Sequence, residues 1–222
     1  MRTFDEIYQI AADRKGGPSS LEAEISAAES TVKLIKLGDD RWLSMMTKSV
    51  FQAGFNWKVV AAMWPGFEEV FDGFDIGKCA MLNEDDFDRL VSDKRIIRYG
   101  AKIRAVQENA QFCIGLIKAD GGVGKALTNW PRTDYIGLLA MLKKDATRLG
   151  GKTGQYFLRQ MGADGFILSN DVVARLIAEG VVDKQPTSMK TNADVQEAFN
   201  NWMDQSGRSL TEISQILARS VG

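Results

Sequence analysis

The chain has 222 residues, enough to bury a full hydrophobic core as one large domain or as two small lobes. Its net charge of −1 excludes an overall electrostatic field that would attract nucleic acid or an anionic membrane, so any DNA-binding surface must be local. The sequence contains no histidine and two cysteines, which excludes histidine-based triads, histidine-containing zinc sites and four-thiolate zinc sites.

The two cysteines and the amino-terminal segment indicate the cellular compartment in which the protein is expected. Cys79 and Cys113 lie within apolar helical patterns, and nothing at the amino-terminus resembles a signal peptide. No apolar run approaches membrane-spanning length. We therefore expect a cytoplasmic, monomeric protein with reduced thiols, no membrane contact, no metal and no cofactor.

Apolar residues recur at helical spacing along the first third of the chain. A capping box formed by Ser19 and Glu22 opens one predicted helix, and Pro65 is expected to end another. The helices predicted here cover residues 4–11, 19–38, 42–54, 56–65 and 67–74.

The remaining chain shows the same periodicity. Asn83 caps a helix whose first turn is acidic, and Ser209 with Glu212 opens the last helix. The helices predicted here cover residues 83–91, 101–118, 138–148, 153–161, 170–175, 195–202 and 209–217. No segment alternates with period two between hairpin turns, so we predict an all-α fold.

The segment 148–154 links two of these helices through a tight turn with two adjacent glycines. The first amides of the following helix have no partner inside that helix, so they suit an anion such as a DNA phosphate. A glycine turn between helices is also common without any such role. The predicted DNA-binding residues are Arg148, Gly150, Gly151, Lys152, Thr153 and Gly154, supported by Lys143 and Lys144.

The segment 120–125 looks like a nucleotide-binding P-loop but departs from it. Ala119 occupies the first glycine position, and Ala126 occupies the position of the magnesium-binding hydroxyl. The preceding run is helical in pattern, whereas a P-loop follows a strand. We interpret these glycines as a connection between helices.

Several separated segments resemble the DNA-3-methyladenine glycosylase I family of the helix-hairpin-helix glycosylase superfamily. Their order, spacing and residue types agree with that family across a little over half the chain. The matching segments are Phe51-Gln52-Ala53-Gly54-Phe55-Asn56-Trp57, Phe74-Asp75, Ile96-Ile97-Arg98 with Lys102-Ile103, Asn109-Ala110, and Gly162 followed by Asn170-Asp171.

The resemblance implies a two-lobed helical fold in which the 148–154 turn grips DNA. We expect one globular unit over residues 1–222, with a glycosylase-like core at 42–180 and the helix-hairpin-helix at 142–162. Residues 1–38 and 185–222 would supply additional helices.

The resemblance also implies a pocket for a base flipped out of the duplex. Aromatic faces stack on a base and attract a cationic one, so Trp57, Phe55 and Trp42 are candidates together with Gln52. Ser49 stands where the family carries a pocket glutamate, which makes it a changed specificity position. Asp171 is the candidate catalytic residue, because an aspartate opening this helix stabilises the oxocarbenium-like transition state in the wider superfamily.

The family's zinc site has no counterpart, since Val172 and Leu176 occupy the positions of two of its ligands. We expect a DNA glycosylase that hydrolyses the N-glycosidic bond of an alkylated purine, of the 3-methyladenine type, in double-stranded DNA containing a damaged base. Two alternatives remain: a catalytically inactive helix-hairpin-helix DNA-binding module, and an all-α protein-interaction domain.

Overall fold

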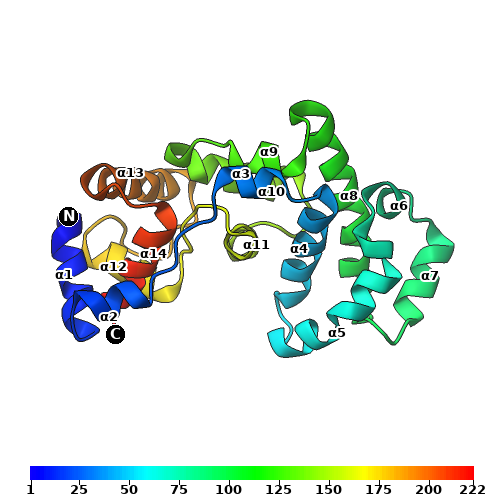
Figure 1. Ribbon diagram of the computed structural model, residues 1–222, viewed down its shortest axis with the longest axis horizontal. Helices are drawn as coiled ribbons and strands as arrows, with labels where there is room; N and C mark the ends of the chain where they lie inside the picture. Colours follow the sequence, from blue (N-terminus) through cyan, green and yellow to red (C-terminus); the bar gives the residue numbers. More distant parts are fainter. The chain divides into compact units, whose positions relative to one another are not determined.

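The computed structural model describes residues 1–222, and its regular elements are all helices (Figure 1), which confirms the predicted all-α class. The first half contains α1 (Phe4–Arg14), α2 (Pro18–Ala23), α3 (Thr31–Ile35), α4 (Asp39–Gln52), α5 (Trp57–Val70), the 3₁₀ turn η1 (Asp72–Phe74), α6 (Ile76–Ala80), α7 (Glu84–Ser92) and α8 (Gly100–Asp120). The second half contains α9 (Val123–Thr128), the 3₁₀ turn η2 (Arg132–Asp134), α10 (Tyr135–Asp145), α11 (Lys152–Met161), α12 (Asn170–Ala178), α13 (Met189–Ser206) and α14 (Leu210–Arg219). No helix is long and apolar enough to cross a membrane.

The chain divides into two compact units. One consists of residues 1–29, 130–138 and 162–222, and we call it the terminal unit; the other consists of 30–129 and 139–161, and we call it the central unit. The predicted core at 42–180 is therefore shared between them, because residues 130–138 and 162–180 belong to the terminal unit.

The central unit is built around α4, which packs against α8, α11 and α5. Nine of its 14 residues are buried, so α4 is the core helix of this unit. Stacked aromatic rings fill the space beside it, with Trp64 parallel to both Phe67 and Phe74. This packing fixes the position of the carboxyl end of α4, beside which the candidate site lies.

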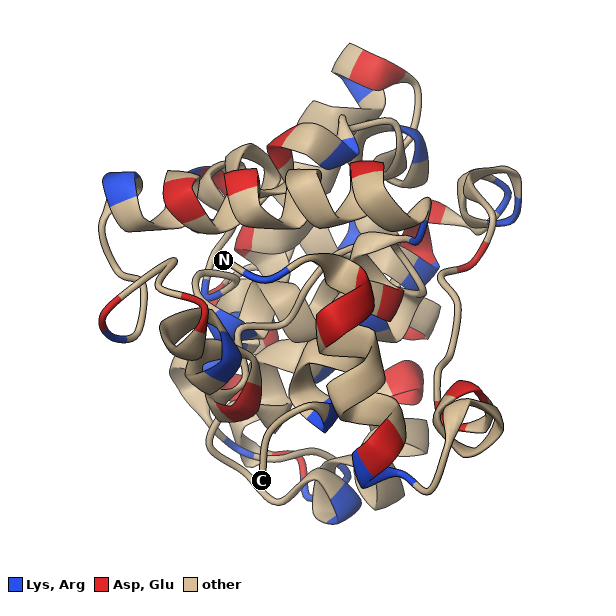
Figure 2. Ribbon diagram, turned by 90° about the vertical axis from the view of Figure 1, so that its left-hand side faces the viewer, with Lys and Arg blue, Asp and Glu red and all other residues tan.

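The terminal unit is built around α14, which packs against α12, α1 and α13. The non-helical segment before α12 is held by side chains of α14, since Thr211 accepts a hydrogen bond from the amide of Gly165 and Ser214 accepts one from Ile167. Lys and Arg alternate with Asp and Glu over the face seen in Figure 2, so neither sign dominates it.

The predicted helix over 19–38 is wrong. Pro18 at the first position begins the short helix α2, and the chain then runs without regular structure until α3. Side chains of α14 bond the backbone of this stretch: Gln215 bonds both the amide and the carbonyl of Ser26, and Arg219 donates to the carbonyl of Glu24. These tertiary bonds replace the helical ones that the apolar spacing predicts.

The predicted break at Pro65 is also wrong, because α5 continues through it to Val70. The proline removes one hydrogen bond. The stacked rings of Trp64 and Phe67 lie on either side of it in sequence, 4.9 Å apart, and their packing keeps the helical path. The expected separate helix over 67–74 is therefore the end of α5 followed by η1.

Glu179 connects the amino-terminus to α12 and is a buried carboxylate. It accepts hydrogen bonds from the amide and guanidinium of Arg2 and from Arg175. Burial acts to raise its pKa, but these bonds prevail and hold the pKa below the ordinary value of 4.5. The bonds therefore contribute stability above about pH 4.5, and that stability is lost as the pH falls through the folded-state pKa.

We expect Glu179→Gln to lower the free energy of unfolding at pH 7 by about 1–3 kcal/mol. Its stability should also fall less steeply than that of the wild type between about pH 5 and pH 3. Urea unfolding at several pH values measures both effects. Glu197→Gln, an exposed change on α13 of the same unit, is the control. Parallel pH curves for wild type and Glu179→Gln would refute this role.

Candidate active site

The turn between α10 and α11 is anchored to the core of the central unit. The buried amide of Asn109 on α8 bonds both backbone groups of Thr147: Oδ1 accepts from its N–H at 2.8 Å, and Nδ2 donates to its carbonyl at 3.1 Å. The side chain of Leu149 is buried two residues later. The turn is therefore held from both sides rather than being a loose connection.

The local backbone geometry requires glycine at two positions of this turn. Gly151 has a φ of 60°, which favours glycine, and a Cβ on Gly154 would lie 2.4 Å from the carbonyl oxygen of Leu149. Arg148 also has a positive φ, 62°, and this costs a non-glycine residue on the order of 1 kcal/mol. The hairpin predicted at 148–154 is thus present, and the helix predicted to start at Thr153 begins one residue earlier, at Lys152.

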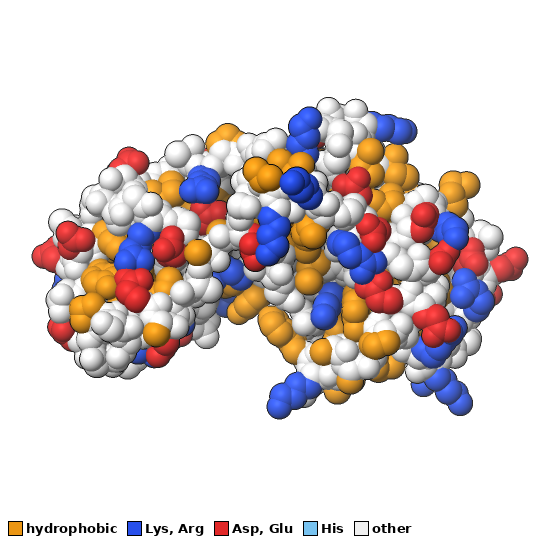
Figure 3. Space-filling view, in the orientation of Figure 1, with side chains coloured by type: hydrophobic (Ala, Val, Ile, Leu, Met, Phe, Trp, Pro, Cys, Tyr) orange, Lys and Arg blue, Asp and Glu red, His pale blue; other side chains and the backbone are white.

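Basic side chains are concentrated at this hairpin. The side chains of Lys143, Lys144, Arg148 and Lys152 are exposed, and Asp145 is the one acidic residue between positions 143 and 154. Lys144 lies 3.8 Å from that carboxylate. Figure 3 shows basic and acidic side chains interspersed over much of the face it displays. The excess of positive charge at the hairpin is therefore a local feature, as the net charge of the chain requires.

If the hairpin grips phosphate, Lys152→Glu should weaken binding to any duplex about tenfold and make the affinity less dependent on salt. Titrations of a fluorescent duplex at several salt concentrations measure both quantities. Lys94→Glu makes the same charge change at an exposed site of the central unit and should have little effect. Equal losses from the two variants would refute the assignment to the hairpin.

Lys102 holds the carboxyl end of α4. Its buried ammonium donates to the carbonyls of Val50, Phe51 and Ala53, at 2.8, 3.4 and 2.5 Å. Burial lowers the pKa of Lys102, and the Arg148 guanidinium lowers it further. The same ammonium lies 4.6 Å from the centre of the Phe55 ring, so Phe55 packs on this cation.

Four side chains meet just beyond this helix end. The indole N–H of Trp57 donates to the carbonyl of Gln52 at 3.1 Å, and Trp57 meets Tyr156 edge to face with ring centres 5.4 Å apart. Gln160 on α11 donates to the side-chain oxygen of Gln52 at 3.0 Å. The Trp57 side chain is 45% exposed, so its ring is held in place yet remains available to a ligand.

Two further predicted base-binding residues lie deeper in α4. Ser49 is 3% exposed, and its hydroxyl has no hydrogen-bond partner. Trp42 is completely buried, packs edge to face on Phe157, and has an indole N–H without an acceptor. Unsatisfied buried groups are uncommon in folded proteins. The roles of Ser49 and Trp42 in base recognition stay predictions.

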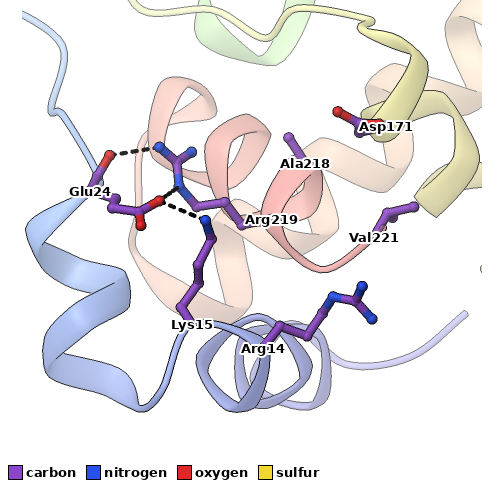
Figure 4. Close-up of a pocket in the computed structure, with 7 residues that line it drawn as sticks. All are labelled: Arg14, Lys15, Glu24, Asp171, Ala218, Arg219 and Val221. Carbon is purple, nitrogen blue, oxygen red and sulfur yellow. Dashed lines mark hydrogen bonds and ion pairs between the residues drawn. The ribbon is translucent and has the colours of Figure 1, made fainter.

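Asp171 belongs to the terminal unit. It lies in the first turn of α12, whose N-cap is Ser169, and its exposed carboxylate faces a cavity of about 490 Å³ (Figure 4). The cavity is lined by Arg14, Lys15, Glu24, Asp171, Ala218, Arg219 and Val221. Within it, Glu24 pairs with Lys15 and Arg219, whereas Asp171 stands apart from these pairs.

Arg175, one turn further along α12, has a structural role. Its guanidinium donates to the hydroxyl and the carbonyl of Ser220 and pairs with Glu179. The same helix carries Val172 and Leu176, both buried and apolar. No group of three or more Cys, Asp or Glu side chains is placed to hold a metal ion, so the residues present do not fit the zinc site of the resembled family.

Sequence reasoning missed Tyr156 and Gln160. They are four residues apart on α11, so they lie on one helical face, and this spacing is the one signal that could have paired them. It also missed the clamps formed by Lys102 and Asn109, although both residues occur in the segments that carry the family resemblance.

The fold is similar to that of solved helical DNA glycosylases. An 8-oxoguanine DNA glycosylase from Methanocaldococcus jannaschii is similar with a TM-score of 0.54 at 12% identity, covering 95% of this chain and 89% of that one. 3-Methyladenine DNA glycosylase I from Staphylococcus aureus is similar with a TM-score of 0.53 at 20% identity, covering 71% and 92%. At these identities the likeness shows the fold alone.

The family to which this chain belongs is shown by its sequence. The sequence model of the methyladenine glycosylases matches residues 33–163, more than half of the chain, so the chain belongs to the methyladenine glycosylase family. It is also 40% identical over 60 residues to DNA-3-methyladenine glycosylase 1 of Escherichia coli (strain K12). That match spans 27% of this chain and about a third (32%) of the length of the curated relative.

Proposed function

We propose that this protein is a DNA glycosylase of base-excision repair that hydrolyses the N-glycosidic bond of an alkylated purine. The observation that carries the proposal is the pairing, within one unit, of an anchored cationic hairpin with the Trp57, Gln52, Tyr156 and Gln160 cluster. The hairpin suits a phosphate backbone, and the cluster suits a flat base removed from the stack. Membership of the methyladenine glycosylase family supports 3-methyladenine as one such base.

In the proposed reaction the duplex binds at the hairpin as the damaged nucleotide flips out and stacks on Trp57. The bond between C1′ and the base nitrogen breaks, and the electron pair leaves with the base. Water adds to C1′ and loses a proton to solvent, leaving an abasic site. Asp171 supplies a negative charge that stabilises the positive charge on the sugar in the transition state.

A cationic alkylated base already carries a weakened glycosidic bond, so the protein needs no strong general base. Binding, positioning and one stabilising charge suffice for such a substrate. We place this activity in the cytoplasm, on double-stranded DNA, with the protein acting as a monomer.

The alternative of a DNA-binding module without excision is favoured by one observation, the buried, unpartnered hydroxyl of Ser49 at the position where the family carries a pocket glutamate. The test is to incubate the protein with alkylated duplex DNA and to count abasic sites by alkaline strand cleavage. Cleavage sites that accumulate with protein support the glycosylase, whereas binding without them supports the module. Absence of both binding and cleavage would favour the protein-interaction domain.

A further inference from the structure

Helix α11 faces the carboxyl end of α4 with two side chains of the cluster to which the proposed function gives no individual role. Tyr156 meets the ring of Trp57, and one helical turn later Gln160 bonds Gln52. α11 and α4 pack against each other, so both residues belong to the wall around the exposed Trp57 ring. The hairpin helix therefore places Tyr156 and Gln160 beside the exposed Trp57 ring.

The Gln52 and Gln160 carboxamides form a neutral hydrogen-bonding pair. One N–H of one amide bonds the oxygen of the other, so the pair keeps one unused carbonyl and one unused NH₂ group. This holds whichever of the two amides donates. The unpartnered hydroxyl of Ser49 lies one turn earlier on α4 than Gln52, and it is buried. The unused amide groups of this pair are complementary to the edge of a base that carries both a hydrogen-bond donor and a hydrogen-bond acceptor.

No carboxylate accompanies these groups. The acidic residues of α4 are Asp39 and Asp40 in its first turn, three turns from Gln52, and α11 has none. The segment 53–56 between α4 and α5 has none either. The one buried cation nearby, Lys102, is engaged by three carbonyls. These three segments thus place no anion beside Trp57 with which to select a base by its positive charge.

We propose that Tyr156 and Gln160 are part of the base pocket, and that its substrates include uncharged damaged purines with a donor beside an acceptor, read by the Gln52–Gln160 pair. This rests on the proposed glycosylase function and extends it beyond cationic bases. An uncharged purine leaves C1′ with the electron pair as its anion, which takes a proton from solvent. Hypoxanthine is the simplest such purine, since its N1–H donates and its O6 accepts. It also mispairs with thymine, which lowers the cost of flipping it out.

The test compares two duplexes, one containing 3-methyladenine and one containing a single deoxyinosine opposite thymine. Base release is measured under single-turnover conditions and expressed relative to the protein-free rate. The wild type should release hypoxanthine at least about tenfold faster than the protein-free control. Gln160→Ala should lower hypoxanthine release about tenfold, the usual effect of losing a hydrogen-bonded pair to a base, with a change below about threefold for 3-methyladenine.

Two further variants sharpen the test. Gln160→Glu introduces a carboxylate at the same reach and should shift the preference toward the cationic 3-methyladenine. Gln111→Ala, an exposed glutamine on α8 of the same unit, should leave both rates unchanged. Release of 3-methyladenine without hypoxanthine, or equal hypoxanthine release by wild type and Gln160→Ala, would overturn the inference and leave the proposed function intact. Release of neither base from duplexes that the protein binds would overturn both.

Discussion

Replacing Asp171 by asparagine should slow base release on the order of 100-fold, the usual effect of removing one group that stabilises transition-state charge. The carboxylate is exposed at the start of α12 and makes no ion pair with the residues that line its cavity. Asparagine has nearly the same shape and also suits the first turn of a helix. The change therefore removes the charge with little effect on the fold.

Single-turnover release of 3-methyladenine by the variant and the wild type measures this effect. Affinity for undamaged duplex should stay equal or rise slightly, since a negative charge has been removed. Asp183→Asn removes an exposed charge elsewhere in the terminal unit and serves as the matched control. If Asp171→Asn releases the base at the wild-type rate, the aspartate has no part in the chemistry.

Replacing Trp57 by alanine should lower release of a damaged base by about 10- to 100-fold, because stacking on an aromatic side chain stabilises a bound base by about 1–3 kcal/mol. The ring is fixed by its bond to the Gln52 carbonyl and by Tyr156, and it is still half exposed. Phenylalanine at this position keeps a face for stacking and loses only the N–H donor. We therefore expect Trp57→Phe to retain most of the activity.

Release rates of both variants, with affinity for undamaged duplex alongside, separate base capture from DNA binding. The affinity should be unchanged in both, because the phosphate contacts are assigned to the hairpin. Val59→Ala, an exposed change on the same helix, is the control. Wild-type release by Trp57→Ala would mean that the base binds elsewhere.

The helices with strong local signals were predictable from sequence. Asn83 caps α7 and Ser209 opens α14 through capping boxes, and the glycine turn before α11 lies where it was expected. The failures occur where distant contacts prevail over local pattern. Residues 24–29 have apolar helical spacing, but Gln215 and Arg219 bond the backbone of Ser26 and Glu24, and the stretch has no regular structure after α2.

The residues of the candidate site also fall into two groups, those that a local sequence motif predicts and those that only the folded chain brings together. Gln52 and Trp57 are five residues apart, so a single motif suggests both, and the structure joins them by a hydrogen bond. Gln160 is 108 residues from Gln52, and no local pattern links the two. The paired carboxamides became visible only when α11 was seen packed against α4. Asp171 remains a prediction from the resemblance, supported by its exposure in the first turn of α12.

The most direct test of the central claim is to identify the bases that the purified protein releases from methylated duplex DNA by mass spectrometry. We predict free 3-methyladenine in amounts that rise with protein and time, and on the order of 100-fold slower release by Asp171→Asn. Absence of any released purine, from duplex that the protein demonstrably binds, would contradict the assignment as a glycosylase.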